Sequence, residues 1–269
     1  MMNKNWIVVL WFAFILTGNA HARGMSGAGG REDNFMVANG QGISSPSFFG
    51  ALHGENPAGL VLNQTLKLQG GMAAISDSTA TLRESGALLV GNGYLGAGAE
   101  YAQYNSGAYA SGTGVINFGA AGMIPSMATT FGISGHSDTG GGGSSYDFGM
   151  FFEFIQRLRI AVMMKNLTHG IGVVGAGLMF NLDPMVDLVL DADSDIKNSL
   201  GVVKPGLSLH TDRIHFTASY GYRYRGLSDA LLYSKFSAGL GIRISENFLV
   251  EYQYRTLPQH LLGLTLRLN

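Results

Sequence analysis

The sequence predicts an all-β protein, a transmembrane antiparallel β-barrel of about 14 strands with an N-terminal hatch or plug segment. Three observations predict this fold. Hydrophobic residues make up 46% of the chain and charged residues only 13%, where soluble domains carry about 25% charged residues. The first residues are typical of an exported protein. From about residue 63 onward, apolar residues alternate with small or polar ones.

The alternation has the character of a membrane barrel. In "KFSAGLGIRI" (residues 235–244), Phe236, Leu240 and Ile242 fall on one face and Ser237, Gly239 and Arg243 on the other. The segments "RLRIAVMMKN", "FLVEYQYR", "LLGLTLRL" and "IHFTASYGYRY" repeat the pattern. A soluble sandwich would carry exposed charge on every strand, whereas the polar face here is mostly Gly, Ser and Thr. A continuous apolar face with tyrosines near strand ends is expected where the outer face meets lipid.

Residues 63–269 hold about fourteen such segments, and we take this range as the barrel domain. Their approximate centres are Lys67, Leu88, Ala99, Phe118, Phe131, Met150, Val162, Ala176, Leu188, Gly206, Ala218, Leu240, Val250 and Leu264. This length suits fourteen strands of about 10 residues joined by connections of about 5. Every second connection is tight, as at Asp183-Pro184, and the others are mostly longer. Tight turns on the periplasmic side and longer loops outside are typical of outer-membrane barrels.

A glycine motif in this region admits two interpretations. Gly91-x-Gly93-x-x-Gly96 matches a dinucleotide-binding turn, but that site needs a helix to begin at the third glycine. The residues that follow, "YLGAGAEYAQY", alternate as a strand does. We therefore interpret Asn92-Gly93 as a hairpin turn in which both residues have positive φ. The sequence indicates no cofactor.

The N-terminus predicts export. Lys4 precedes the short apolar run "WIVVLWFAFIL", and "NAHA" ends in a small-x-small pattern, which together predict a signal peptide over residues 1–22 with cleavage near Ala22. Absence of Cys excludes disulfides, zinc–thiolate sites and thiol catalysis. A net charge of −1 gives no reason to expect a nucleic-acid partner. The expected location is the outer membrane of a Gram-negative bacterium, with membrane lipid as the surrounding partner.

Residues 23–62 do not alternate and are rich in Gly, Ser and Asn. They could form a disordered periplasmic tail. A barrel of this size, however, lies between small barrels that fill their own interior and large ones that hold a water channel. We therefore predict that residues 23–62 form a plug, or hatch, inside the barrel.

The motif "NPAGL" (residues 56–60), after a small-residue segment and before fourteen strand segments, resembles the FadL family of outer-membrane transporters for hydrophobic compounds, which includes the related PorV-type barrels. The resemblance implies that Asn56, Pro57, Ala58 and Gly59 belong to the hatch motif. It implies passive transport of small hydrophobic compounds such as long-chain fatty acids, with a hydrophobic ligand or detergent as the bound partner. The alternative, favoured by the short loops, is a non-transporting PorV-type barrel that anchors or shuttles periplasmic or secreted proteins. A simple porin is a third possibility, which a plug disfavours.

Charged residues on the polar face are expected to line the lumen, because a charge facing lipid costs about 2–4 kcal/mol at the midplane. The candidates are Glu100, Glu153, Arg159, Lys165, Arg223, Lys235, Arg243, Glu251, Arg255 and Arg267. These residues either form a network of paired charges inside the barrel, or the excess of positive charge on the last strands forms a lining that guides a carboxylate through the lumen.

Other chemistry is not indicated. No Ser-His-acid set can be assembled from the spacing, so we predict that the protein is not an enzyme. "DADSD" (residues 191–195) places three carboxylates near a loop but lacks the Gly and Glu of a calcium loop. We interpret that loop as solvated and predict no metal, and we expect Asp191 on the lumen face. The C-terminal "GLTLRL" keeps a glycine followed by alternating leucines, which fits recognition by a barrel-insertion machinery as a partner.

Overall fold

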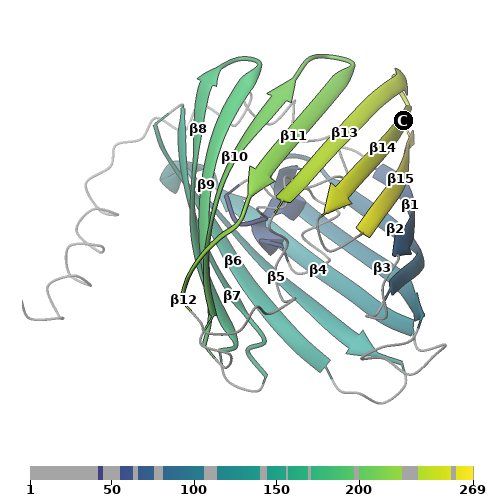
Figure 1. Cartoon of the computed structure of the whole chain (residues 1–269), viewed down its shortest axis with the longest axis horizontal. Coiled ribbons are helices and arrows are strands. Elements are labelled where there is room, and N and C mark those ends of the chain that lie inside the picture. Colours follow the sequence, from purple (N-terminus) through teal and green to yellow (C-terminus); the bar gives the residue numbers. More distant parts are fainter. Residues whose placement is uncertain are drawn as a thin grey trace, which may run out of the picture.

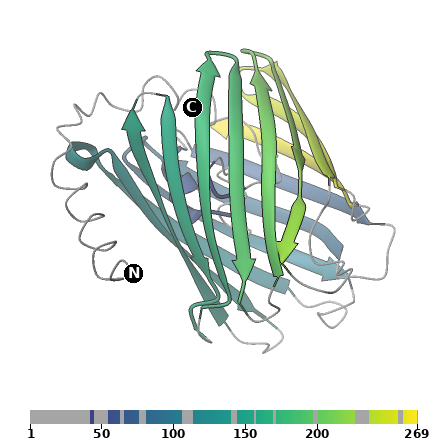
Figure 2. The same ribbon diagram turned by 60° about the vertical axis from the view of Figure 1, so that its left-hand side comes forward.

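In the computed structural model, one antiparallel sheet closes on itself into a barrel (Figures 1 and 2). The structure describes residues 42–44, 55–62, 66–75, 81–105, 114–139, 144–155, 157–168, 171–196, 200–225, 236–255 and 259–268. The strands in the first half of the barrel are β1 (Leu66–Ile75), β2 (Thr81–Gly91), β3 (Leu95–Asn105), β4 (Gly114–Ile124), β5 (Thr129–Asp138), β6 (Ser144–Ile155) and β7 (Leu158–Lys165). Those in the second half are β8 (Val173–Asp183), β9 (Val186–Asp195), β10 (Leu200–His210), β11 (Ile214–Tyr220), β12 (Tyr222–Arg225), β13 (Phe236–Ser245), β14 (Phe248–Arg255) and β15 (Gln259–Leu268). Two short 3-10 helices, η2 (Pro57–Leu62) and η3 (Pro125–Met127), complete the described elements.

The strands follow one another round the barrel in chain order. β1 pairs with β15 from Leu66↔Leu268 to Ile75↔Gln259, which joins the two ends of the barrel. β11 pairs with both β10 and β13, so the ladder runs round without a break. Closure removes the unpaired strand edges that neither water nor lipid could satisfy within a bilayer.

β11 and β12 are two parts of one strand, because both pair with β10. The described residues therefore form fourteen strands, and the predicted fold class is confirmed. The interruption lies opposite Pro205, between the pairs Gly206↔Ser219 and Val203↔Tyr222. Proline has no backbone N–H to donate, so the ladder cannot continue at this point on both sides of β10.

Alternation between the two faces agrees with the sequence. Leu240 and Leu264 are 39% and 44% exposed, whereas Ser237 and Thr265 on the same strands are 3% and 4% exposed. Apolar side chains thus cover the outside of the barrel, and the lumen side carries Gly, Ser, Thr and charged residues together with buried apolar residues such as Leu89 and Phe151. No helix within the described residues is long and apolar enough to cross a membrane.

The tight connections lie at one end of the barrel, at the top in Figure 1, where β15 also ends. The glycine motif is the β2–β3 hairpin, so the dinucleotide interpretation is excluded by the strand that follows it. The expected turn geometry was wrong in detail. Gly93 has φ +82°, but Asn92 does not share a positive φ. Its side chain instead accepts hydrogen bonds from the N–H groups of Tyr94 and Leu95 at 2.9 and 2.8 Å.

The sequence placed the carboxylates of residues 191–195 near a solvated loop, but Asp191, Asp193 and Asp195 all belong to β9. Residues 1–22 lie outside the described residues, as do residues 63–65 at the expected start of the barrel. The division into signal peptide, hatch and barrel therefore stays a prediction.

Candidate functional site

Part of the chain that precedes β1 lies inside the barrel. We call residues 42–44 and 55–62 the lumen segment. All six residues of η2 are buried, and η2 contacts β2, β3, β4, β5 and β6. Figure 1 shows this short dark helix enclosed by the strands. The lumen segment is the candidate functional site, because it lies buried inside the barrel against five of the strands.

Glycines of the inner wall make room for η2. A Cβ at Gly149 on β6 would lie 1.8 Å from Oδ1 of Asn56, and one at Gly132 on β5 would lie 2.3 Å from the carbonyl carbon of Pro57. A Cβ at Gly96 on β3 would lie 1.9 Å from the backbone of η2. These distances are far shorter than any van der Waals contact, so a larger residue at any of the three positions would have to displace part of the lumen segment. At Gly96 and Gly132 the strand meets the backbone of η2, and at Gly149 it meets the side chain of Asn56.

Apolar contacts hold η2 at two places on the wall. Leu60 and Val61 pack with Ala87 and Leu89 of β2 and with β4. The second cluster joins the lumen segment to β6 and β7 and consists of Ile43, Ala58, Leu62, Phe151, Ala161 and Met163. The interior of this barrel is therefore apolar beneath the lumen segment.

Asn56 is the polar centre of the NPAG motif. Its Nδ2 donates to the carbonyl oxygens of Ile43 (3.0 Å), Val162 (3.2 Å) and Met150 (3.4 Å), and its Oδ1 accepts from the N–H of Ala58 (3.1 Å). The backbone N–H of Asn56 donates to Gly42 at 2.6 Å. One amide therefore joins both parts of the lumen segment to β6 and β7. The role of the motif as a hatch stays a prediction.

Asp191 of β9 holds the other part of the lumen segment. Its carboxylate accepts from the N–H of Ile43 (2.9 Å), the N–H of Ser44 (3.1 Å) and the hydroxyl of Ser44 (2.6 Å). Nη1 of Arg159 donates to the carbonyl of Ser44 at 3.3 Å. We call these contacts of Asp191 and Arg159 with Ile43 and Ser44 the clasp.

Arg159 is itself fixed from two sides. It is 1% exposed, its Nη2 donates to Glu153 at 3.2 Å, and its guanidinium lies 5.0 Å from the centre of the Phe151 ring. Its interactions with an acid, an aromatic face and a backbone carbonyl account for a fully buried charge.

Glu100 belongs to a polar chain across the inner wall. The amide nitrogen of Asn117 donates to Glu100 at 2.7 Å. The amide oxygen of Asn117 lies 2.9 Å from Nδ1 of His136, whose Nε2 lies 3.0 Å from Asp147. The carboxylate of Asp147 accepts from the N–H of Asn166 at 3.0 Å. This chain links β3, β4, β5 and β6 through side chains as well as through the backbone ladder.

The remaining sequence candidates do not form one cluster. Glu251 is 0% exposed, and Lys165 interacts electrostatically with Glu55 of the lumen segment as well as with Asp147. Half-buried, inward-facing positions are occupied by Arg223, Arg243 and Arg267. Lys235 lies outside the described residues, and of Arg255 only the strand position is described. The lining role of all ten candidates stays a prediction.

A serine and a histidine do meet near the tight-turn end. Oγ of Ser208 lies 2.7 Å from Nε2 of His215, and the ring of His215 packs edge-on against His210. The carboxylate of Asp187, however, faces His210 at 3.3 Å, and Ser208 is only 3% exposed. A nucleophile needs access to a substrate as well as a base oriented by an acid. We interpret this cluster as polar packing.

Sequence reasoning missed the clasp. It expected Asp191 on the lumen face, but it named no partner for this carboxylate and gave no role to Ser44. It also gave no role to the wall glycines Gly96, Gly132 and Gly149, although glycine at inward-facing strand positions is a signal of close backbone approach.

These features define a class of protein: a fourteen-stranded transmembrane β-barrel of the outer-membrane type that encloses a segment of its own chain. Three solved structures have this fold. The toluene transporter TbuX of Ralstonia pickettii has a TM-score of 0.60 at 12% identity, covering 88% of this chain and 99% of its own. The CymD monoaromatic hydrocarbon channel has a TM-score of 0.55 at 14% identity, covering 95% and 98%. A deletion mutant of the TodX monoaromatic hydrocarbon channel has a TM-score of 0.50 at 12% identity, covering 80% and 92%.

The predicted resemblance to FadL-type barrels is confirmed at the level of the fold. No protein-family model matches the chain, and no curated protein matches it in sequence.

Proposed function

We propose that this protein carries small hydrophobic compounds passively across the outer membrane, with the lumen segment as the gate. The observation that carries the proposal is the apolar surface beneath the lumen segment. Ala87 and Leu89 of β2, and Phe151 and Met163 of β6 and β7, are buried against it. A water-filled pore has no need of such a surface on its inner wall.

Movement of the lumen segment would uncover this surface. Exposing apolar area to water costs about 25 cal/mol per Å², so a hydrophobic ligand that takes the place of η2 would be favoured over water. The shared fold with a toluene transporter and two hydrocarbon channels supports the same substrate class. Long-chain fatty acids belong to this class as the finer proposal.

The gate opens at the clasp in this proposal. η2 is wedged between glycine backbones and apolar side chains, whereas Ile43 and Ser44 are held by the hydrogen bonds of Asp191 and Arg159. Hydrogen bonds can be exchanged for water or for a polar ligand group. A steric wedge can be released only by moving the segment as a whole.

A disulfide lock tests the gate. The protein has no Cys, and a Cβ at Gly175 on β8 would lie 3.4 Å from Cγ1 of Ile43. The pair Ile43→Cys with Gly175→Cys therefore brings two thiols within bonding range. In liposomes, toluene and long-chain fatty-acid uptake should stop under oxidising conditions and return with reductant. The single variant Ile43→Cys serves as the control and should not respond to redox conditions.

The other outcomes are distinct. Undiminished uptake by the locked barrel would contradict a gate at the clasp. Absence of uptake by the wild-type barrel, together with a co-purifying protein, would support the PorV-type anchor instead. Rapid uptake of sugars by the locked and unlocked forms alike would indicate a simple porin.

A further inference from the structure

The clasp surrounds a site that is filled by the chain itself. Ile43 and Ser44 are 1% and 0% exposed, and we call the space that they fill the clasp site. Both residues donate to Asp191, which is 0% exposed. Ser44 also accepts from Arg159, which is 1% exposed. Burying a charged group without polar partners is costly, so a group that replaces Ile43 and Ser44 must make the same hydrogen bonds.

Two inward-facing glycines of β8 form the floor of the clasp site. A Cβ at Gly177 would lie 2.0 Å from Oδ1 of Asp191 and 2.9 Å from Cβ of Ser44. A Cβ at Gly175 would lie 2.6 Å from Cδ1 of Ile43. Gly177 thus lets the carboxylate reach Ser44, and Gly175 leaves a recess for an alkyl group. The apolar cluster around that alkyl group consists of Ala58, Leu62, Phe151, Ala161 and Met163.

The hydrogen bonds of the clasp define the chemical class of its occupant. An ionised carboxylate only accepts, and a guanidinium only donates. Asp191 accepts two N–H groups and one O–H group from residues 43 and 44, and Arg159 donates to the carbonyl of Ser44. A matching ligand therefore carries N–H or O–H donors and a carbonyl oxygen on one short unit, beside an alkyl group. An acylated amino-acid amide has this pattern. A hydrocarbon makes none of these bonds, and a fatty-acid carboxylate presents no donor to Asp191.

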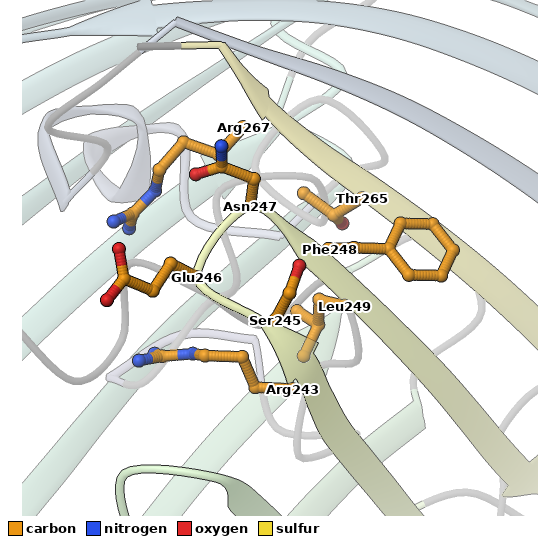
Figure 3. Close-up of a pocket in the computed structure, with 8 residues that line it drawn as sticks. All are labelled: Arg243, Ser245, Glu246, Asn247, Phe248, Leu249, Thr265 and Arg267. Carbon is orange, nitrogen blue, oxygen red and sulfur yellow. The ribbon is translucent and has the colours of Figure 1, made fainter.

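Another polar recess of the barrel lacks these properties. The hollow at the tight-turn end, where β13, β14 and β15 meet, is lined by Arg243 and Arg267 among others (Figure 3). It has room for about one water molecule, so an alkyl chain cannot enter it. The clasp site, in contrast, already holds an alkyl side chain and the polar backbone of two residues. The space for a ligand of this class is the space that Ile43 and Ser44 occupy.

We propose that the clasp site recognises amphiphiles whose polar end carries an amide, and that Ile43 and Ser44 are a built-in occupant that such a ligand replaces. Asp191 binds the donors of the ligand, Arg159 binds its carbonyl, and the recess over Gly175 receives its alkyl chain. The inference rests on the proposed function and narrows its substrate class to acyl amides. Binding and opening of the clasp are then one event, because ligand and lumen segment compete for the same atoms.

The test uses the full-length protein in a non-ionic detergent and isothermal titration calorimetry. The probes are N-octanoyl-L-serinamide, its D enantiomer and octanoate. The L enantiomer should bind about tenfold more tightly than either of the others, as expected for one additional hydrogen bond to a charged group. The two enantiomers partition equally into detergent, so a difference between them arises at the protein. Equal binding of all three probes would overturn the proposal.

Hydrogen exchange shows whether the ligand replaces the lumen segment. Binding of the L enantiomer should accelerate exchange at the amides of Ile43 and Ser44 about tenfold or more, because both lose Asp191 as acceptor. Binding that leaves these two amides protected would overturn the clasp site as the place of binding.

Variants separate the two competitors. Ser44→Ala removes a 2.6 Å hydrogen bond of the built-in occupant and none of the ligand, so the L enantiomer should bind about tenfold more tightly, a gain that misfolding cannot produce. Asp191→Asn supplies a donor at the wall and should abolish the preference for the amide over octanoate. Asp193→Asn is the control, because Asp193 pairs with Lys204. Unchanged affinity in Ser44→Ala, or an unchanged preference in Asp191→Asn, would overturn the proposal.

Failure of this inference and failure of the proposed function give different results. Toluene uptake by a barrel that binds all three probes equally would support passive transport and overturn the amide site. Selective binding of the L enantiomer by a barrel that takes up no toluene would support the amide site and contradict transport.

Discussion

The carboxylate of Asp191 on the barrel wall accepts a 2.6 Å hydrogen bond from the hydroxyl of Ser44, which lies 147 positions earlier in the chain. Two backbone N–H groups of the same short stretch donate to this carboxylate as well. One side chain of β9 thus satisfies three donors of the lumen segment. Asp191 is 0% exposed, so water can replace it only when the clasp opens.

The first prediction concerns this carboxylate. Asp191→Asn keeps the shape but replaces one accepting oxygen by an NH₂ group that faces N–H donors. Hydrogen bonds to a charged group contribute about 1.5–3 kcal/mol each, so hydrogen exchange at the amides of Ile43 and Ser44 should accelerate about tenfold or more. Exchange measured by mass spectrometry in micelles checks this.

Asp193→Asn is the control for that experiment. Asp193 lies two positions further along β9 and pairs with Nζ of Lys204 at 2.5 Å, not with the lumen segment. Equal exchange rates in Asp191→Asn and Asp193→Asn would show that the clasp does not hold residues 42–44.

A second prediction concerns the glycine track. Gly149→Ala should destabilise the protein by about 1–3 kcal/mol, the range for overpacking a filled interior, because its Cβ would overlap Oδ1 of Asn56 at 1.8 Å. Gly86→Ala on β2 is the matched control, since nothing lies within 4 Å of a Cβ at that position. Urea unfolding in micelles measures both. A neutral Gly149→Ala would mean that η2 is not wedged against β6.

A third prediction separates charge from size at Asn56. Its Nδ2 faces the carbonyl oxygens of Ile43, Val162 and Met150. Asn56→Asp would place a buried carboxylate against three acceptors, whereas Asn56→Ala only removes the donor. Leaving a buried charge without donors costs more than leaving a neutral group unpaired. Asn56→Asp should therefore unfold at lower urea than Asn56→Ala, and the reverse order would contradict these hydrogen bonds.

Strand positions and faces could be predicted from sequence because they depend on local pattern. The expected centres fall within the strands, and the face assigned to Ser237 and Leu240 is the face observed. Lipid outside and a polar lumen inside impose a period of two on every strand. The face on which a strand residue lies can therefore be assigned from its neighbours in the sequence alone.

The clasp could not be predicted in this way. Asp191 and Ser44 are brought together by closure of the whole sheet, and no local pattern states which strand the lumen segment will contact. The aspartates of "DADSD" were expected near a solvated loop, because charge density is a loop signal. In β9, Asp191 instead pairs with the lumen segment and Asp193 with Lys204. The hairpin at Asn92-Gly93 was predicted from the sequence, but its φ angles were not. They follow from the hydrogen bonds that the Asn92 side chain accepts.

The last prediction concerns lipid as the solvent of the outer face. Leu264 lies near the middle of β15 and is 44% exposed, whereas Ile244 lies near the tight-turn end of β13 and is 65% exposed. On a water-exposed surface, an arginine would be tolerated at both positions. In a bilayer, Leu264→Arg should cost about 2–4 kcal/mol and Ile244→Arg about 0–1 kcal/mol, because the penalty depends on depth. Urea unfolding from phospholipid vesicles measures the difference. Equal, small effects at both positions would contradict a membrane-embedded outer face, whatever passes through the lumen.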